Sequence, residues 1–428
     1  MVTHDNRFDI SIFRRGKMPF FLLLFTLVTA CTPTTGSSLS SSSLSETSSS
    51  SETSSSSSES SSNSSSSSSA YSVPSSSISM TSYSTAITGS SVFTLGSAGN
   101  YLSSETNSTE LNVYSIEMHD QYGDATLFDY GNYEILVDGG AQADGPYVKA
   151  VLDTYVTDHV LDMLVVTHAH SDHYGGLAST STWSNITNIT NIVDYGYTGA
   201  NYTSGYRSIR SSYVSKGSEY HPITELIMHS DGIYHISERM SLQFLNTNCY
   251  VAPGGTASDP NTTSICFLLT FDNTVFYMNG DSTVDTDTGV RSNYPGLISA
   301  DQVVVSKGAH HGSASNGSNG RTFLQVFLKP DYVFISGAID LVNQTASGVV
   351  EVQHPYYAAI HNFSLHTDQV YWNGINGTLT MHSDGAAITM TGATRTLDYY
   401  VQGVVVNRAS EKNITIFQSQ WYLNYLVP

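Results

Sequence analysis

Serine makes up nearly every residue from Gly36 to Ala70, and this segment limits what the rest of the chain can fold into. It has almost no apolar side chains, so folding would bury too little to offset the conformational entropy lost. We therefore expect residues 31–90 to be a flexible tether. The folded part is then 91–428, long enough for one α/β domain with a substantial core.

The first thirty residues predict export. Arg14, Arg15 and Lys17 precede an apolar run that ends at Ala30, too short to span a bilayer but of the length of a signal-peptide core. Small residues before Cys31 resemble the lipobox of bacterial lipoproteins. We expect removal of residues 1–30 and a lipid on Cys31 that anchors the protein to a membrane. An ordinary signal peptide and a membrane anchor helix are the alternatives, and all three place the folded part outside the cytoplasm.

Charge and cysteine content exclude two further classes of protein. The chain carries 36 acidic and 16 basic side chains, a formal net charge of −20, which repels phosphate and disfavours a nucleic-acid-binding surface. Three cysteines are too few for a disulfide scaffold. Cys249 and Cys266 either form a disulfide or remain buried thiols.

Apolar runs separated by turn residues predict a mixed α/β domain. The expected strands are 111–118, 125–128, 133–138, 161–167, 264–270, 274–278, 302–306 and 332–336. The expected helices are 146–159 and 322–328, and 370–428 is expected to supply closing strands of the same body. The polar, Tyr- and Asn-rich stretch from about 180 to 260 receives no assignment; we expect it to lie near the site and shape specificity.

Four potential metal ligands follow the strand that ends at Thr167. They are His168, His170, Asp172 and His173. Three imidazoles and a carboxylate so close together are costly to bury unless a cation joins them. The sequence therefore predicts a metal site at the carboxyl end of this strand, with an exposed His-rich loop as the alternative.

This His-x-His-x-Asp-His motif resembles the signature of the metallo-β-lactamase superfamily. Other segments resemble the extracellular hydrolase domain of DNA-uptake competence proteins, so that the likeness spans about 110–390. They are Gln121-Tyr-Gly-Asp124-Ala, Ile135-Leu-Val-Asp138-Gly-Gly, Asn261-Thr-Thr-Ser264, Met278-Asn-Gly-Asp281, Lys307-Gly-Ala-His310-His311-Gly-Ser and His354-Pro355.

The resemblance implies a four-layer αββα sandwich with two divalent metal ions, zinc or manganese, at one edge between the sheets. It implies that His168 and His170 bind one metal, that Asp172 and His173 bind the other, and that Asp281 bridges them. One of His310 and His311 would complete the second site, and the other would contact the negative charge that develops on the substrate.

The first metal site departs from the pattern of many superfamily members, which supply a third histidine. His221, His229 and His235 do not lie in a matching turn. His354 fills this gap or has a structural role. Asp138 is expected to hold its turn and orient a metal-binding histidine. Asp124 is expected to have the same supporting role, but in a position from which it could approach the metals.

The chemistry that the resemblance implies is hydrolysis by a metal-bound hydroxide, with Asp172 as both ligand and proton acceptor. We expect a phosphoester substrate, a phosphodiester or phosphorylcholine type, small or associated with the cell envelope, and a monomeric enzyme. The alternatives are an extracellular nuclease of the DNA-uptake type, a lactonase or β-lactamase-type hydrolase, and a non-catalytic surface-binding lipoprotein.

Overall fold

The computed structural model describes residues 93–103, 108–119, 122–197, 204–253, 255–338 and 354–396, and the backbone of three short strands within 349–416. The chain divides into two units, 1–84 and 85–428, and all described residues belong to the second. The predicted signal peptide (1–30), Cys31 and the tether (31–90) lie outside the described residues. Within the described part, no helix has the length and apolar character needed to cross a membrane.

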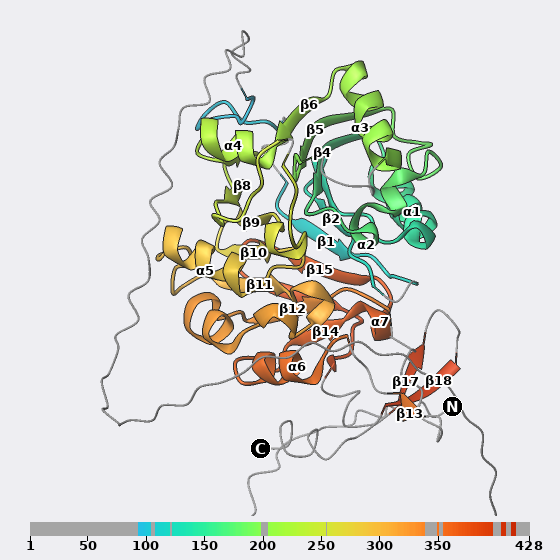
Figure 1. Cartoon of the computed structure of the whole chain (residues 1–428), viewed down its shortest axis with the longest axis vertical. Helices are drawn as coiled ribbons and strands as arrows, with labels where there is room; N and C mark the ends of the chain where they lie inside the picture. Colours follow the sequence, from blue (N-terminus) through green and yellow to red (C-terminus); the bar gives the residue numbers. More distant parts are fainter. Residues whose placement is uncertain are drawn as a thin grey trace, which may run out of the picture. The chain divides into compact units, whose positions relative to one another are not determined.

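The first large sheet has eight strands in the order β16-β15-β1-β2-β3-β4-β5-β6 (Figure 1). The strands β3 to β6 run parallel to one another, and the other neighbours are antiparallel. In chain order they are β1 (Leu111–Ser115), β2 (Thr126–Asp129), β3 (Glu134–Val137), β4 (Val160–Val166), β5 (Asn188–Asp194), β6 (Glu219–Pro222), β15 (Leu379–Ser383) and β16 (Ile388–Thr391).

The second large sheet has seven strands in the order β14-β12-β11-β10-β9-β8-β7. Its parallel part comprises β10, β11, β12 and β14. The strands are β7 (Ile233–His235), β8 (Met240–Leu245), β9 (Cys266–Phe271), β10 (Thr274–Met278), β11 (Val303–Lys307), β12 (Tyr332–Ile335) and β14 (Val370–Trp372). A separate small sheet pairs β13 (Val349–Val350), β18 (Lys412–Ile416) and β17 (Val404–Asn407).

Helices cover the outer faces of the two large sheets, except for the helix Ile223–His229, which packs on the core between them. The α-helices are α1 (Gly145–Tyr155), α2 (Ser171–Tyr174), α3 (Ser204–Lys216), α4 (Ile223–His229), α5 (Val284–Asn293), α6 (Tyr357–Ser364) and α7 (Asn373–Asn376). The 3₁₀ turns are Gln142–Asp144, Gly176–Ala178, Asn261–Thr263, His310–Gly312 and Ser315–Gly317, and Phe323–Leu328 forms a π-helix.

Alternation along the strands produces the layers, because successive side chains of a strand point to opposite faces. On β9, Phe267 and Leu269 face the core between the two sheets, where Phe276 of β10 meets Phe128 of β2 edge to face. Cys266 and Leu268 face an outer core that includes α5 and α6 residues. A third core joins the first sheet to α1 and α3, so the domain is the expected αββα sandwich.

The expected strands and helices are present, with ends that differ by a few residues. The unassigned stretch from 180 to 260 contains β5 to β8, α3 and α4, which extend both sheets. Of the predicted closing strands, β14 to β16 join the large sheets, whereas β18 pairs with β13 and β17 in the small sheet. Cys249 and Cys266 are free thiols, so the disulfide alternative is not realised.

Candidate metal centre

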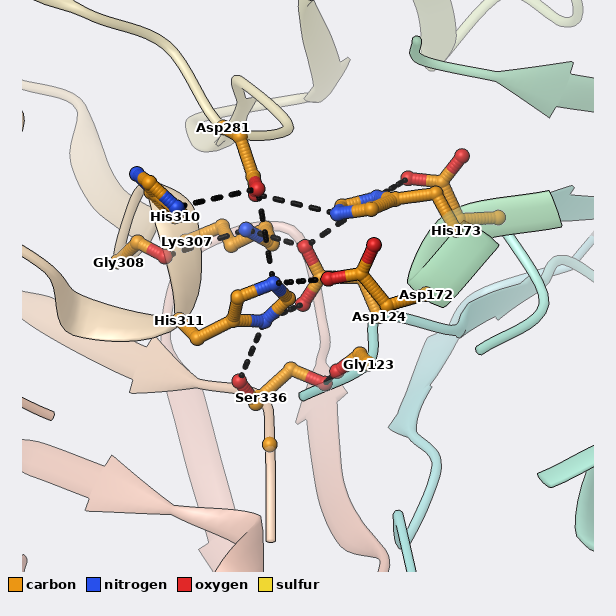
Figure 2. A network of polar contacts seen from close by, with 12 residues as sticks. Gly123, Asp124, Asp172, His173, Asp281, Lys307, Gly308, His310, His311 and Ser336 are labelled. Atoms are coloured by element: carbon orange, nitrogen blue, oxygen red, sulfur yellow. Dashed lines mark hydrogen bonds and ion pairs between the residues drawn. The ribbon is translucent and has the colours of Figure 1, made fainter. Parts of the chain in front are cut away.

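The candidate site lies where the ends of the two large sheets meet. His168 and α2 follow β4 of the first sheet, while Asp281, His310 and Ser336 follow β10, β11 and β12 of the second. Figure 2 shows Asp281 facing His173 from the first sheet and His310 and His311 from the second. The carboxyl ends of parallel strands share one edge, which is why segments far apart in the sequence meet here.

The first ligand group consists of His168, His170 and Asp281, with one ligand atom of each lying within 4.8 Å of the others. His168 Nε2 lies 3.1 Å from His170 Nδ1 and 3.7 Å from Asp281 Oδ2. Burial, together with the positive charge on His173, lowers the pKa of His168 well below its ordinary value. His168 is therefore neutral, as a metal-binding imidazole must be.

The second ligand group consists of Asp124, His173, Asp281 and His311, all buried. Asp281 Oδ1 lies 3.2 Å from His173 Nε2, and Asp281 Oδ2 lies 3.5 Å from His311 Nε2. Asp172, which is partly exposed, places Oδ2 3.1 Å from His311 Nε2. Asp281 thus belongs to both groups: its Oδ2 faces His168 of the first group and His311 of the second, and its Oδ1 faces His173 of the second.

Strong electrostatic coupling holds the second group together. Burial alone lowers the pKa of His311, but the charges of Asp281 and Asp124 and the hydrogen bond to Asp172 outweigh it and raise this pKa to about 10. Burial raises the pKa of Asp281, yet the charges of His173, His311 and His310 hold it well below its ordinary value. Burial also raises the pKa of Asp172, but the hydrogen bond from His311 and the charges of His173 and His311 together outweigh it and lower this pKa.

The residues fit a cation. The buried carboxylates need positive charge, which His173 and His311 supply by holding protons that a metal ion would displace. The buried atoms His173 Nε2 and Asp281 Oδ1 form no hydrogen bond although they face each other. Imidazole nitrogen and carboxylate oxygen are ligands that suit Zn²⁺ and Mn²⁺.

Further residues fix the orientation of the ligands. Asp138 Oδ2 accepts hydrogen bonds from Thr167 Oγ1 at 2.7 Å and from His173 Nδ1 at 2.8 Å, and its Oδ1 accepts one from the Thr167 amide. His311 Nδ1 lies 3.2 Å from the carbonyl oxygen of Ser336. A carbonyl only accepts, so Nδ1 carries the proton and Nε2 points into the ligand group.

The structure places the side chains of His310 and His311 in different positions. Both have left-handed backbone, with φ of 50° and 52°, which sends the two adjacent side chains in different directions. His311 is buried in the second group. His310 stays at the rim, 20% exposed, with Nε2 3.8 Å from Asp281 Oδ2. The adjacent ring of His354 lies 5.7 Å from that of His310 and 4.8 Å from that of Tyr122, so His354 is also a rim residue.

Of the residues that the sequence nominated for the metal site, His168, His170, His173, Asp281, His311 and Asp124 lie in the two groups. Asp172, which was expected as a ligand of the second metal, lies beside His311 and outside both groups, and His310 and His354 lie next to them. The three histidines considered as a third ligand belong to neither group of the described residues. His221, for example, is buried against Phe93 and Tyr234. Sequence reasoning missed the contributions of Lys307, Thr167 and Ser336, although Lys307 opens one of the motifs on which the resemblance rests.

Two glycines allow the ligand loop to pack closely. A Cβ on Gly176 would lie 2.1 Å from the carbonyl oxygen of Gly139, and a Cβ on Gly139 would lie 2.2 Å from Leu177. No side chain fits at either position without a shift of backbone or core. The Asp138 turn and the segment after α2 therefore depend on glycine for their contact.

Residues 120–236 match the family model described as the metallo-beta-lactamase superfamily. The match makes this segment, about a quarter of the chain, similar to the metallo-β-lactamase superfamily. It includes the segment from His168 to His173 together with Asp124 and Asp138, and it ends before Asp281. No curated protein matches the chain in sequence.

Several solved structures are similar at low identity. The metallo-beta-lactamase fold protein YhfI from Bacillus subtilis is 17% identical over 46% of this chain and 71% of that one, with a TM-score of 0.28. A diphosphatase from the PhnP family is 9% identical over 52% and 85%, with a TM-score of 0.29. Human tRNase Z, short form, is 12% identical over 61% and 91%, with a TM-score of 0.31. Likenesses at this level carry no argument about substrate.

Proposed function

We propose that this chain is a metal-dependent hydrolase that holds two divalent metal ions and cleaves phosphoesters. The position of Asp281 carries the proposal: one of its oxygens faces His168 of the first ligand group at 3.7 Å, and the other faces His173 of the second at 3.2 Å. A carboxylate shared in this way is suited to bridging two cations, since it offsets their mutual repulsion.

Each residue of the candidate site has a defined task in this proposal. His168 and His170 hold one zinc or manganese ion with Asp281, and His173 and His311 hold the other with the same carboxylate. When bound, the metals supply an activated water and neutralise negative charge on the scissile group. Asp172 lies at the exposed side of the second group, where its carboxylate accepts a proton. This makes it the candidate general base.

His310 is the candidate for contact with the substrate. Its side chain is at the rim and partly exposed, and burial together with neighbouring positive charges lowers its pKa. A neutral imidazole at this position donates a hydrogen bond to an oxygen on which charge develops. His354 and Tyr122 stand beside it and would flank the same part of the substrate.

The proposed substrate is a small or envelope-associated phosphoester, of phosphodiester or phosphorylcholine type. The resemblance to the hydrolase domain of competence proteins supports phosphoester chemistry, and two metals suit an in-line displacement at phosphorus. The net charge of −20 argues against a surface that tracks a long nucleic acid. We place the enzyme outside the cytoplasm as a monomer on a lipid anchor at Cys31, a proposal that rests on the first 31 residues.

The test is metal analysis of the purified chain, paired with hydrolysis of bis(p-nitrophenyl) phosphate and p-nitrophenyl phosphorylcholine with and without chelator. We expect two equivalents of metal and turnover that the chelator abolishes, and the preferred ester separates nuclease-like from choline-ester activity. Absence of both metal and turnover after Zn²⁺ or Mn²⁺ is added back would overturn the proposal. Turnover of a lactone or a β-lactam alone would move the assignment to that class.

A further inference from the structure

Lys307 is a buried cation inside the candidate site that the ligand groups do not account for. It is 3% exposed, and its ammonium group has three polar neighbours. Nζ lies 2.6 Å from Asp124 Oδ2 and donates hydrogen bonds to the carbonyl oxygens of Gly280 at 2.8 Å and Gly308 at 3.2 Å. Two of the three N–H donors of the ammonium group are thus used in hydrogen bonds to carbonyl oxygens, and the contact with Asp124 is an ion pair.

The three contacts connect three separate segments of the site. Gly280 has a left-handed φ of 50° and immediately precedes Asp281, and its carbonyl oxygen also accepts the amide of His310 at 3.1 Å. Gly308 opens the turn that carries His310 and His311. Asp124 comes from the loop before β2. One ammonium group therefore ties the bridging carboxylate, the histidine turn and the Asp124 loop together (Figure 2).

Asp124 occupies a particular place relative to the two histidines of the second group. Its Oδ2 lies 3.7 Å from His173 Nδ1, and its Oδ1 lies 3.7 Å from His311 Nδ1. The Nε2 atoms of the same two rings face Asp281 instead, at 3.2 and 3.5 Å. Asp124 thus stands behind both rings, and Asp281 stands in front of them.

We propose that Lys307 and Asp124 form a positioning ion pair, which holds Asp124 behind His173 and His311 so that their Nε2 atoms bind the second metal. Lys307 compensates the buried charge of Asp124 and fixes this carboxylate on the Nδ1 side of both rings. Removal of the ammonium leaves an uncompensated buried carboxylate and frees the Gly280 and Gly308 turns. This inference rests on the proposed function, because it assigns a task toward the second metal.

The test compares the affinity for Zn²⁺ of the full-length wild-type chain with that of Lys307→Met and of the double variant Asp124→Asn/Lys307→Met. We measure it by competition with a chromogenic chelator. We expect Lys307→Met to lose about 10- to 100-fold in affinity for one metal, the range found when residues that orient metal ligands are removed. Lys149→Met is the matched control, because it breaks a surface ion pair with Asp153 and should leave affinity unchanged.

The double variant separates positioning from folding. It removes both charges, so we expect its urea midpoint to return toward the wild-type value while its zinc affinity stays reduced. Recovery of wild-type affinity in the folded double variant would overturn the inference, because the pair would then be only structural. Equal or tighter zinc binding by Lys307→Met would overturn it too.

¹⁵N NMR spectra of the histidines add a measurement that does not depend on the stability of the fold. In zinc-loaded wild-type protein labelled at histidine, we expect the ¹⁵N shifts to show zinc on Nε2 of His173 and His311, and in Lys307→Met a fraction bound through Nδ1 or unbound. Unchanged shifts in the variant would contradict the inference. A wild-type chain that binds zinc but cleaves no phosphoester defeats the proposed function alone, and one that binds no zinc overturns both.

Discussion

The two ligand groups share Asp281 but are built differently. The first takes His168 and His170 from one short stretch, and the hydroxyl of Thr167 contacts His168 Nδ1 at 3.1 Å. The second assembles His173 and His311 from different sheets. Its rings have Asp138 and the Ser336 carbonyl behind them. The surroundings of the second group therefore preorganise its ligands, whereas the ligands of the first group are placed mainly by the short motif that contains them. We expect the second group to bind metal more tightly.

Removal of the shared carboxylate should weaken metal binding at both ligand groups, and we expect this variant to have the largest effect on turnover. Asp281→Asn takes a charged ligand from both groups, so we expect loss of both metals and a fall in turnover on the order of 10³-fold, equivalent to about 4 kcal/mol. Metal analysis and steady-state kinetics check this. Asp285→Asn, at an exposed position in the first turn of α5, is the control and should behave as wild type. Retention of two metals by Asp281→Asn would refute a bridging role.

Single histidine variants should break one group at a time. His168→Asn should leave one tightly held metal, because the second group is intact, whereas His311→Asn should leave only the weaker one. Chelator titration monitored by metal analysis would show this as one missing step in each variant, the early step for His168→Asn and the late step for His311→Asn. The reverse order would mean that the first group is the tighter one.

Variants of the supporting residues should produce smaller changes in the same direction. Asp138→Asn weakens the acceptor for His173 Nδ1, so we expect about a 10- to 100-fold loss of affinity at the second group. Thr167→Val removes the hydroxyl that contacts His168 Nδ1 and that also donates to Asp138, so we expect a smaller loss of affinity at the first group and a still smaller one at the second. Isothermal titration with Zn²⁺ resolves the two sites, and equal effects of both variants on both sites would argue against separate support.

Glu134, at the other end of β3, is a buried carboxylate whose charged neighbours Asp162 and Asp158 are acidic, in contrast to the carboxylates of the candidate site, which face histidines. Burial, with added repulsion from Asp162 and Asp158, raises the pKa of Glu134 from 4.5 to about 9. The folded state then keeps a proton that the unfolded state loses above about pH 4.5. Stability contributed by this group is full below that pH and is lost as the pH rises through about 9.

Glu134→Gln should therefore flatten the pH dependence of unfolding, the smallest of the expected effects. Urea midpoints at pH 5 and pH 8.5 should differ less in the variant than in the wild type, with a gain in stability at the higher pH. Glu238→Gln, at an exposed position, should retain the wild-type difference. An unchanged slope in Glu134→Gln would mean that Glu134 ionises normally in the folded state.

The sequence predicted the strands that are apolar and missed those that are not. Strands such as β10 (Thr274–Met278) read as apolar runs because both of their faces are buried. β5 carries Asn188, Thr190 and Asn191 among its seven residues, and α3 is rich in serine and tyrosine. Tertiary context builds these elements, for example where the buried Asp194 accepts hydrogen bonds from the hydroxyls of Tyr206 and Tyr220.

The site was predictable as a set of residues but not as an arrangement. Spacing within one motif brings His168, His170 and His173 together regardless of the rest of the fold. Two adjacent histidines, in contrast, are equivalent in a sequence, and it is the left-handed backbone of both that buries His311 and leaves His310 at the rim. The support from Lys307 was hidden because a lysine in an acidic chain reads as a surface residue.

Neither sheet carries a complete ligand group of its own. The group of His168 and His170 is completed by Asp281 from the other sheet, and His311 contacts Asp172, which lies 139 residues away in the sequence. Partly made chains and half-folded intermediates therefore present only fragments of the coordination sphere. We therefore expect a metal ion to bind only after the apolar interior between the two sheets has formed, so that metal binding follows folding instead of nucleating it.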